Sequence, residues 1–219
     1  MIQEKRIIYE HLDVPDIYMF DVFRQYGGYQ RFEKALKELP PEEISDMVLQ
    51  SGLKGRGGAG FSTGLKWSFV PRDIEPRYLC CNADESEPGT FSNRYILERI
   101  PHLLVEGILI SCYALGIHSC YVYIRGEFTL GKKNLDQAIE EARNHGYLGE
   151  DILGSGFSLE IYTHPGAGAY ICGEETGLIE SLEGKRGQPR VKPPFPAVSG
   201  VFSKPTVVNN VETLCNIPF

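Results

Sequence analysis

Apolar side chains recur with helical spacing in two stretches of the first fifty residues. The two stripes consist of Phe32, Ala35 and Leu36, and of Ile44, Met47 and Val48. The second stripe lies within 41–51, where acidic residues in the first turn and a glycine after the last turn mark the start and stop of a helix. We therefore predict a helical N-terminal region over 1–50, whose side chains serve packing.

Beyond residue 50 the pattern alternates between short runs rich in β-forming residues and longer amphipathic stretches. Strands are predicted at 77–82, 119–125 and 157–163, and helices at 93–100, 101–115, around 133–143 and after 174. The helix over 101–115 is apolar on nearly all sides, so we expect it to be buried. Strands that alternate with helices give βαβ units, and the sequence therefore predicts an α/β fold with a parallel sheet.

The end of the chain has a different pattern. Residues 187–206 contain five prolines and little periodicity, which is typical of a functional loop or a linker. Lys192 and Phe195 are the side chains in this loop that could touch a ligand. Residues 206–214 are predicted to begin a helix with an asparagine cap.

Composition narrows the class of protein. The chain has 219 residues, of which 42% are hydrophobic and 23% charged, as in soluble globular proteins. The formal net charge of −7 argues against non-specific binding to nucleic acids or to anionic membranes. Residues 1–6 lack the apolar run of a signal peptide, and the most apolar stretch, 103–115, is too short to span a bilayer.

The cysteines do not suggest a metal site or a disulfide framework. None of the six belongs to a C-x-x-C pair, and we expect most of them to be buried thiols. They are Cys80, Cys81, Cys112, Cys120, Cys172 and Cys215.

Five of the twelve residues over 55–66 are glycine, and Arg56 and Lys66 bracket the run. Glycine amides beside cations suit a phosphate, although glycine clusters also form plain loops. The stretch contains a G-x-G-x-x-G match, but a predicted helix precedes it where the dinucleotide-binding fingerprint requires a strand. We therefore reject the ordinary fingerprint and leave a nucleotide loop and a plain loop open.

Two further loops follow predicted strands. Residues 82–89 hold three acids within four residues, and 166–175 form a glycine-rich turn that ends in Glu174 and Glu175. The first loop could be a solvated turn, and the helix dipole could explain the two glutamates. Their position at the carboxyl ends of strands favours a ligand site. Because no histidine is spaced for a triad, we predict no catalytic side chain and expect a bound cofactor to carry any chemistry.

Four segments together resemble one family, and the resemblance covers almost the whole chain. The segments are Gly-Arg-Gly-Gly-Ala-Gly-Phe-Ser-Thr-Gly-Leu-Lys-Trp (55–67), Cys-Asn-Ala-Asp-Glu-Ser-Glu-Pro-Gly-Thr-Phe (81–91), Gly-Ala-Gly-Ala-Tyr-Ile-Cys-Gly-Glu-Glu-Thr (166–176) and Lys-Pro-Thr-Val-Val-Asn-Asn-Val-Glu-Thr (204–213). The family is the FMN- and NADH-binding flavoprotein subunit of NADH-quinone oxidoreductase, the F subunit of respiratory complex I. The chain is similar to the N-terminal part of that subunit.

The resemblance implies a fold and its boundaries. It implies a Rossmann-like domain over 51–219 that binds FMN and NADH, with a parallel sheet flanked by helices and the helical lead-in before it. The family continues with a ubiquitin-like domain and an iron–sulfur domain, and we expect its [4Fe–4S] cluster only in that further part. The family usually has a proline where this chain has Ser62, which leaves the rigidity of the loop open.

The resemblance also implies the site residues, carried over motif by motif. The FMN contacts would be Gly55, Arg56, Gly57, Lys66, Asn82, Asp84, Glu85, Tyr170, Gly173, Glu174, Val208, Asn209, Asn210 and Thr213. The NADH contacts would be Phe61, Lys66, Phe69, Glu87, Glu175, Lys192 and Phe195. Glycine amides and cations suit phosphates, while carboxylates and asparagines suit hydroxyl and amide groups.

The implied function is that of an NADH dehydrogenase module, an oxidoreductase that passes a hydride from NADH to FMN and electrons through iron–sulfur clusters toward quinone. A diaphorase module of an NAD-reducing hydrogenase or formate dehydrogenase shares these features, and a nucleotide-binding scaffold without turnover is a third alternative. The implied partners are a thioredoxin-like [2Fe–2S] subunit and other subunits of the complex. We expect neither nucleic acid binding nor membrane insertion, and a cytoplasmic place in a peripheral arm.

Overall fold

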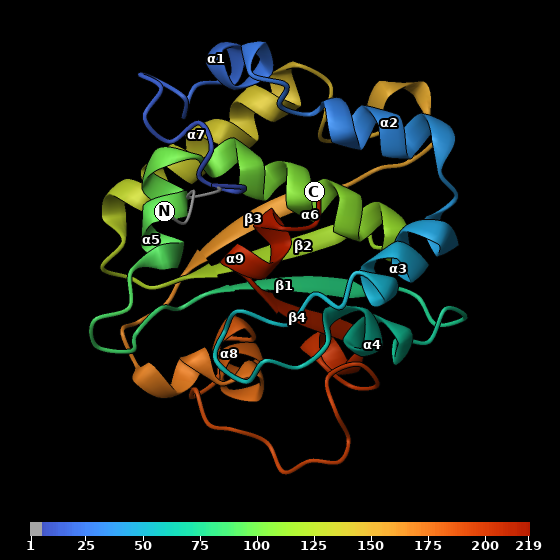
Figure 1. Cartoon of the computed structure of the whole chain (residues 1–219). Helices are drawn as coiled ribbons and strands as arrows, with labels where there is room; N and C mark the ends of the chain where they lie inside the picture. Colours follow the sequence, from blue (N-terminus) through green and yellow to red (C-terminus); the bar gives the residue numbers. More distant parts are fainter. Residues whose placement is uncertain (1–5) are drawn as a thin grey trace, which may run out of the picture.

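A computed structural model describes residues 6–219, in which a four-stranded parallel sheet lies between helices (Figure 1). The strands are β1 (Tyr78–Ala83), β2 (Ser119–Ile124), β3 (Glu160–Pro165) and β4 (Thr206–Asn210). Their order is β3-β2-β1-β4, and every neighbouring pair is parallel. The α/β class and the parallel sheet are confirmed.

The helices agree with most of the sequence expectations. They are α1 (Phe20–Gln25), α2 (Gln30–Glu38), α3 (Pro41–Gln50), α4 (Thr63–Ser68), α5 (Ser92–Arg99), α6 (Pro101–Leu115), α7 (Thr129–Asn144), α8 (Glu175–Leu182) and α9 (Val211–Cys215). Helix α6 is buried along nearly its whole length, as its uniform apolarity predicts. It begins at Pro101, one residue after the end of α5 is capped by Ile100, because proline fits the first turn of a helix but not its interior.

One face of the sheet is sealed by helices. Along β1, alternate residues point to opposite faces, and Leu79, Cys81 and Ala83 belong to the larger core together with buried residues of α5, α6, α7 and α9. Helices α2 and α3 pack against the outer side of α6 (Figure 1). The N-terminal region therefore shares this core, and the division at residue 50 stays a prediction.

The other face of the sheet carries a smaller core and is only partly covered. Cys80 and Val208 pack there with Leu178 and Ile179 of α8. Helix α8 lies on the side of the sheet opposite α6 in Figure 1, and the chain from 187 to 200 loops away beyond it. Polar residues at the carboxyl ends of β1 and β4 are thus left beside a part of the sheet that no long helix covers.

The prediction of a helix over 206–214 is wrong for its first part. Residues 206–210 form β4, and only 211–215 are helical. Val207 and Val208 are β-branched and buried on opposite faces, so tertiary pairing with β1 decides the conformation. The predicted asparagine cap is confirmed, since Asn210 Oδ1 accepts a hydrogen bond from the Glu212 N–H at 2.9 Å. The third predicted strand, 157–163, is observed as 160–165, so it begins three residues later and ends two residues later, because Phe157 and Leu159 are buried before the pairing of β3 begins.

All six cysteines are free and buried, as expected for small apolar side chains. No group of three or more His, Cys, Asp or Glu side chains that could hold a metal ion is found between residues 6 and 219. Over the same range no helix is long and apolar enough to cross a membrane. Residues 1–5, which include most of the segment used to argue against a signal peptide, lie outside the described residues.

Candidate functional site

A cavity of about 930 Å³ opens where β1 and β4 end, between the glycine-rich loop, the start of α8 and the proline-rich loop. Such a volume lies near the upper end of the range of about 300–1,000 Å³ found for small-molecule sites. Its position agrees with the rule that ligands of open α/β sheets bind outside the carboxyl ends of the strands. The residues that line it are Gly55, Gly57, Ala59, Gly60, Phe61, Thr63, Lys66, Phe69, Asn82, Gly173, Glu174, Glu175, Lys192, Phe195, Pro196, Ala197, Val198, Thr206, Val208, Asn209, Asn210 and Thr213.

The glycine-rich loop forms one wall. Gly58 and Gly60 have φ angles of 108° and 65°, which favour glycine. A side chain at Gly57 would meet the Asn210 side chain at 3.4 Å, so the loop backbone lies close to β4. The Arg56 N–H donates to Thr213 Oγ1 at 2.8 Å and fixes the loop to α9. The result is a wall of backbone amides without side chains, suited to a close approach by a phosphate.

Helix α4 follows the loop and places Lys66 in the lining of the cavity. Ser62 caps this helix, since its Oγ accepts from the Leu65 N–H at 3.3 Å. Lys66 Nζ donates to the Val208 carbonyl at 3.1 Å, which links α4 to β4. At Gly64 an added Cβ would lie 2.3 Å from the Leu49 Cα, so only glycine allows α4 to pack this closely on α3.

Two lysines and two glutamates form a charged cluster at the start of α8. Lys66 Nζ lies 3.2 Å from Glu175 Oε2, and Lys192 Nζ lies 2.8 Å from Glu174 Oε1 and 3.3 Å from Glu175 Oε1. Burial acts to raise the pKa of Glu174, but hydrogen bonds from Lys192, Thr176 and Gly177 outweigh it and lower that pKa. The cluster is neutral overall, and an anionic ligand could bind its lysines while hydroxyl donors bind its carboxylates.

Asn82 and Gly173 join β1 to the turn before α8. Asn82 Nδ2 donates to the Gly173 carbonyl at 2.9 Å, and Asn82 Oδ1 accepts from the Asp84 N–H at 3.1 Å. A side chain at Gly173 would meet the Asp84 carbonyl at 3.4 Å. Both residues line the cavity with their positions fixed by these contacts.

In the acidic loop, Asp84 and Glu85 are buried and lie outside the lining of the cavity. Glu85 accepts from the N–H groups of Asn93 and Arg94 at 2.9 and 3.0 Å, and so satisfies the start of α5. Burial raises the pKa of Asp84, whose Oδ2 has no hydrogen-bond partner within residues 6–219. Asp84 Oδ2 and Ser86 Oγ are thus buried acceptors of this loop that have no partner within residues 6–219.

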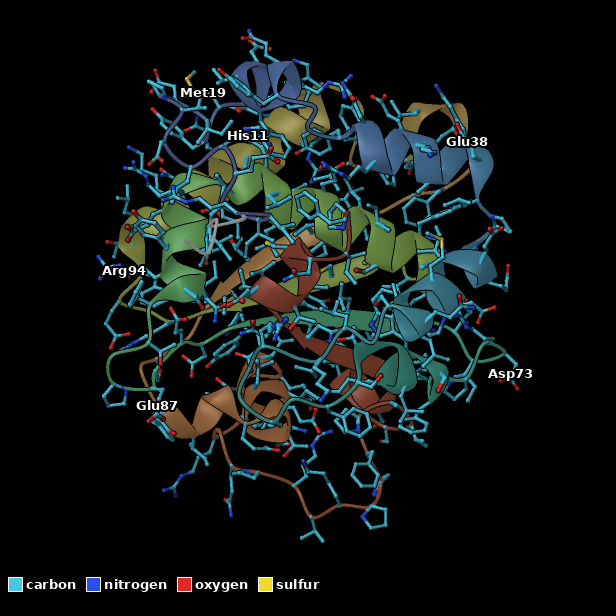
Figure 2. All side chains as sticks on the ribbon, in the orientation of Figure 1. His11, Met19, Glu38, Asp73, Glu87 and Arg94 are labelled. Atoms are coloured by element: carbon cyan, nitrogen blue, oxygen red, sulfur yellow. The ribbon has the colours of Figure 1, made fainter. Side chains whose placement is uncertain are left out.

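Glu87 and Tyr170 also lie outside the cavity lining, and they bind each other instead. The Tyr170 hydroxyl donates to Glu87 Oε2 at 2.5 Å, and this contact raises the pKa of the tyrosine. Glu87 lies at the periphery of the molecule, near the end of the sheet that carries the cavity (Figure 2). The pair connects the loop after β1 with the turn before α8.

The structure thus brings together most of the predicted site residues at one cavity. Those outside its lining are Arg56, Asp84, Glu85, Glu87 and Tyr170. The sequence analysis missed the lining residues Ala59, Gly60, Thr63, Pro196, Ala197, Val198 and Thr206. Thr63 is the most informative of them, because its buried Oγ1 has no partner within residues 6–219. Only its place in the glycine segment could have indicated it.

Residues 48–219 match the Nuo51 FMN-binding domain family. The chain belongs to this family. It is 62% identical over 205 residues to the F subunit of NADH-quinone oxidoreductase from Aquifex aeolicus (strain VF5), covering 94% of this chain and 48% of that protein. It is 58% identical over 200 residues to the corresponding protein of Escherichia coli (strain K12), covering 90% of this chain and 45% of that protein.

Solved structures agree with this membership. The crystal structure of an NAD⁺-reducing [NiFe]-hydrogenase in the H₂-reduced state contains a chain that matches with a TM-score of 0.79 and 38% identity. The match covers 98% of this chain and 34% of that one. The chain spans about half the length of the curated relatives that it matches. The resemblance to the N-terminal part of the flavoprotein subunit and the Rossmann-like fold are therefore confirmed.

The residues present fit FMN. The glycine wall accommodates a phosphate, Lys66 and Lys192 supply positive charge, and the buried acceptor Thr63 Oγ1 in the lining lacks a partner within residues 6–219. Polar side chains on β1 and β4 face the same cavity as apolar and aromatic residues of the two loops. This combination suits a flavin nucleotide, which has a charged end, a hydroxylated chain and an apolar ring.

Proposed function

We propose that the chain is the FMN- and NADH-binding module of an NADH dehydrogenase that passes electrons through iron–sulfur clusters toward quinone. The observation that carries the proposal is the single cavity in which the glycine-rich loop, the asparagines of β4 and the lysine–glutamate cluster meet. When bound, FMN would supply the redox chemistry, as the acceptor of the hydride from NADH. The chain's own groups bind and orient the two nucleotides.

The chain's own residues divide between these two tasks. The amides of Gly55 and Gly57 and the Lys66 ammonium would hold phosphate, while Asn82 and the asparagines of β4 would bind the hydroxylated chain and the ring. Asp84 would enter this set through its unpartnered Oδ2. Glu85 would act indirectly, because its carboxylate is engaged by the start of α5. No side chain needs to transfer a proton during hydride transfer, in agreement with the absence of a predicted catalytic residue.

For NADH the open end of the cavity offers three aromatic rings, Phe61, Phe69 and Phe195, each about half exposed and suited to stacking on a base. Phe61 and Phe69 lie with ring centroids 6.3 Å apart. Lys192 and Glu175 lie at the same end of the cavity. Such a surface would position the nicotinamide against the flavin and exclude water from the space between them.

We expect NADH to be preferred over NADPH, because a 2′-phosphate that approaches Glu87 or Glu175 would meet like charge. The preference for NADH in kcat/KM should narrow in Glu175→Gln. Glu98→Gln serves as the matched control, since Glu98 pairs with Arg94 on α5 outside the lining and should leave the preference unchanged. Equal kcat/KM values for the two nucleotides in the wild-type chain would contradict this expectation.

We propose the same partner subunits and the same place in the cell as the resemblance to the F subunit implies. The proposed partners are a thioredoxin-like [2Fe–2S] subunit and other subunits of a complex, and the proposed place is cytoplasmic, in a peripheral arm. A diaphorase module that works toward NAD⁺ reduction is a second candidate, favoured by the match to an NAD⁺-reducing [NiFe]-hydrogenase. The ratio of NADH oxidation to NAD⁺ reduction in the intact complex would separate the two candidates.

The decisive experiment needs only the purified chain. The chain is mixed with FMN, freed of unbound flavin and titrated with NADH in the absence of oxygen. The absorbance of the oxidised flavin band at about 450 nm is followed. Bleaching of the band in proportion to added NADH is expected. Failure to retain FMN would overturn the proposed site, whereas retention without bleaching would favour a nucleotide-binding scaffold without turnover.

A further inference from the structure

The indole of Trp67 forms a buried contact beside the cavity that the roles above do not use. Its Nε1–H donates to Asn209 Oδ1 at 2.9 Å. Trp67 is 1% exposed and belongs to the larger core, while Asn209 lies on β4 and lines the cavity. The contact therefore links a rigid core residue to a side chain of the site.

This contact determines which way the Asn209 amide points. An indole N–H is a donor only, so its partner must be the amide oxygen rather than the amide nitrogen. The Nδ2 group has no acceptor within residues 6–219, although it is not sealed from its surroundings. Asn209 consequently keeps both N–H donors of Nδ2 free for a ligand, while one lone pair of its Oδ1 is taken by the indole.

The neighbouring residue of α4 keeps the arrangement in place. Lys66 Nζ donates to the carbonyl of Val208, the residue before Asn209, at 3.1 Å. Two successive residues of α4 thus bind two successive residues of β4. A rotation of the Asn209 amide would place its NH₂ against the indole N–H, where two donors would face each other and one hydrogen bond would be lost.

We infer that Trp67 is a positioning residue that fixes the orientation of the Asn209 amide, so that the group of the flavin facing Nδ2 must be a hydrogen-bond acceptor. This inference rests on the proposed FMN site. A carbonyl oxygen or an unprotonated ring nitrogen satisfies the requirement, whereas a ring N–H does not. Trp67 acts on the ligand only through Asn209.

The hydrogen bond can be observed without any ligand. Trp67 is the single tryptophan of the chain, so a ¹⁵N-labelled sample has one indole N–H signal to assign. In Asn209→Leu, which keeps the shape and removes the acceptor, this signal should move. Ser68→Ala is the control, because Ser68 is the adjacent exposed residue and its hydroxyl binds the Leu65 carbonyl instead. An unchanged indole signal in Asn209→Leu would overturn the contact.

A double-mutant cycle on FMN affinity tests the role. Trp67→Phe keeps an aromatic ring, removes the donor and should raise the Kd for FMN about three- to tenfold, because the amide can then rotate. In the Asn209→Leu background the same substitution should change Kd less than about twofold, since there is no amide left to position. Equal effects in both backgrounds would show a packing role and overturn the inference.

Two controls separate the possible failures. If Trp67→Phe does not fold, as judged by circular dichroism, replacement of Trp67 with 3-benzothienylalanine removes the N–H from a ring of nearly the same shape and takes its place in the cycle. If the wild-type chain does not retain FMN, the proposed function fails. If it retains FMN and the two effects are additive, only the role of Trp67 fails.

Discussion

The two faces of the sheet are built from the same strands, but one face forms the main core and the other carries the cavity. On the face toward α6, buried residues of four helices close over the strands in one continuous core. On the face toward α8, the core is small, and beyond it lie a cavity, charged pairs and half-exposed aromatic rings. Period-two alternation lets a single strand contribute to both, as β1 does with Cys81 on one side and Asn82 at the cavity. Stability and ligand binding can therefore be changed separately.

The largest difference between the two faces is expected from truncating a side chain on each. Leu109 of α6 is fully buried, and Leu109→Ala should lower the free energy of unfolding by about 2–5 kcal/mol because it leaves a cavity in the core. Phe195→Ala, at a ring that is 57% exposed, should lower it by less than about 0.5 kcal/mol. Urea unfolding of the two variants measures both free energies. A similar loss in both variants would refute the idea that the face toward α6 determines stability and the face toward α8 does not.

The sealed face also contains a histidine that should make folding sensitive to acid. His102 is fully buried, with Tyr29 Oη 2.8 Å from Nδ1 and Glu141 Oε2 3.1 Å from Nε2. Burial lowers the pKa of His102 from 6.5 to about 4, although Glu141 opposes this shift. Below pH 6.5 the unfolded chain binds a proton here that the folded chain does not, so stability should fall as the pH drops toward about 4.

The size of this loss follows from the shift in pKa, which corresponds to about 3 kcal/mol over that range. Below pH 4 both states are protonated at this site, and the loss should not grow further. Unfolding free energies of the wild-type chain and His102→Gln between pH 7 and pH 4 test the prediction. A pH profile of equal slope in the two proteins would show that other groups cause the acid sensitivity.

On the open face, a substitution is expected to change the affinity for FMN rather than the stability of the fold. Lys66→Met removes a charge at the cavity and should raise the Kd for FMN about 10- to 100-fold, the effect of losing a charged hydrogen bond. Stability should change little, because Glu175 keeps its partner Lys192. Lys132→Met is the matched control on α7, where the lysine pairs with Asp136 away from the cavity, and its Kd should equal that of the wild type.

The smallest effect is expected at Ser62, where the family usually has a proline. Its φ of −59° already suits proline, and no hydrogen bond from its N–H is found in the described part of the chain. Ser62→Pro would lose the cap on Leu65 but restrict the unfolded chain, so the two effects should nearly cancel, to within about 1 kcal/mol. A loss of several kcal/mol in thermal unfolding would show that the loop conformation depends on the serine.

The sealed face was predictable from sequence, whereas the open face was only partly so. Helices such as α6 follow from uniform apolarity and a proline boundary. The strand β4 was missed because its pairing with β1 outweighs the helical appearance of Val207, Val208 and Val211. Sequence motifs indicated the residues around the cavity, but not that the Glu85 carboxylate is turned toward α5, since local spacing does not determine side-chain direction.

The pairing of β4 with β1 has a consequence for the order in which the molecule folds. The pairing of β1 with β4 joins segments that are far apart in sequence, and such contacts form slowly because the intervening loop must close first. Asn82 comes from β1, and Val208, Asn209 and Asn210 come from β4 (Figure 1). Because the cavity needs both strands, we expect it to form only once β4 has paired with β1, and FMN binding would report the chains in which this pairing is complete.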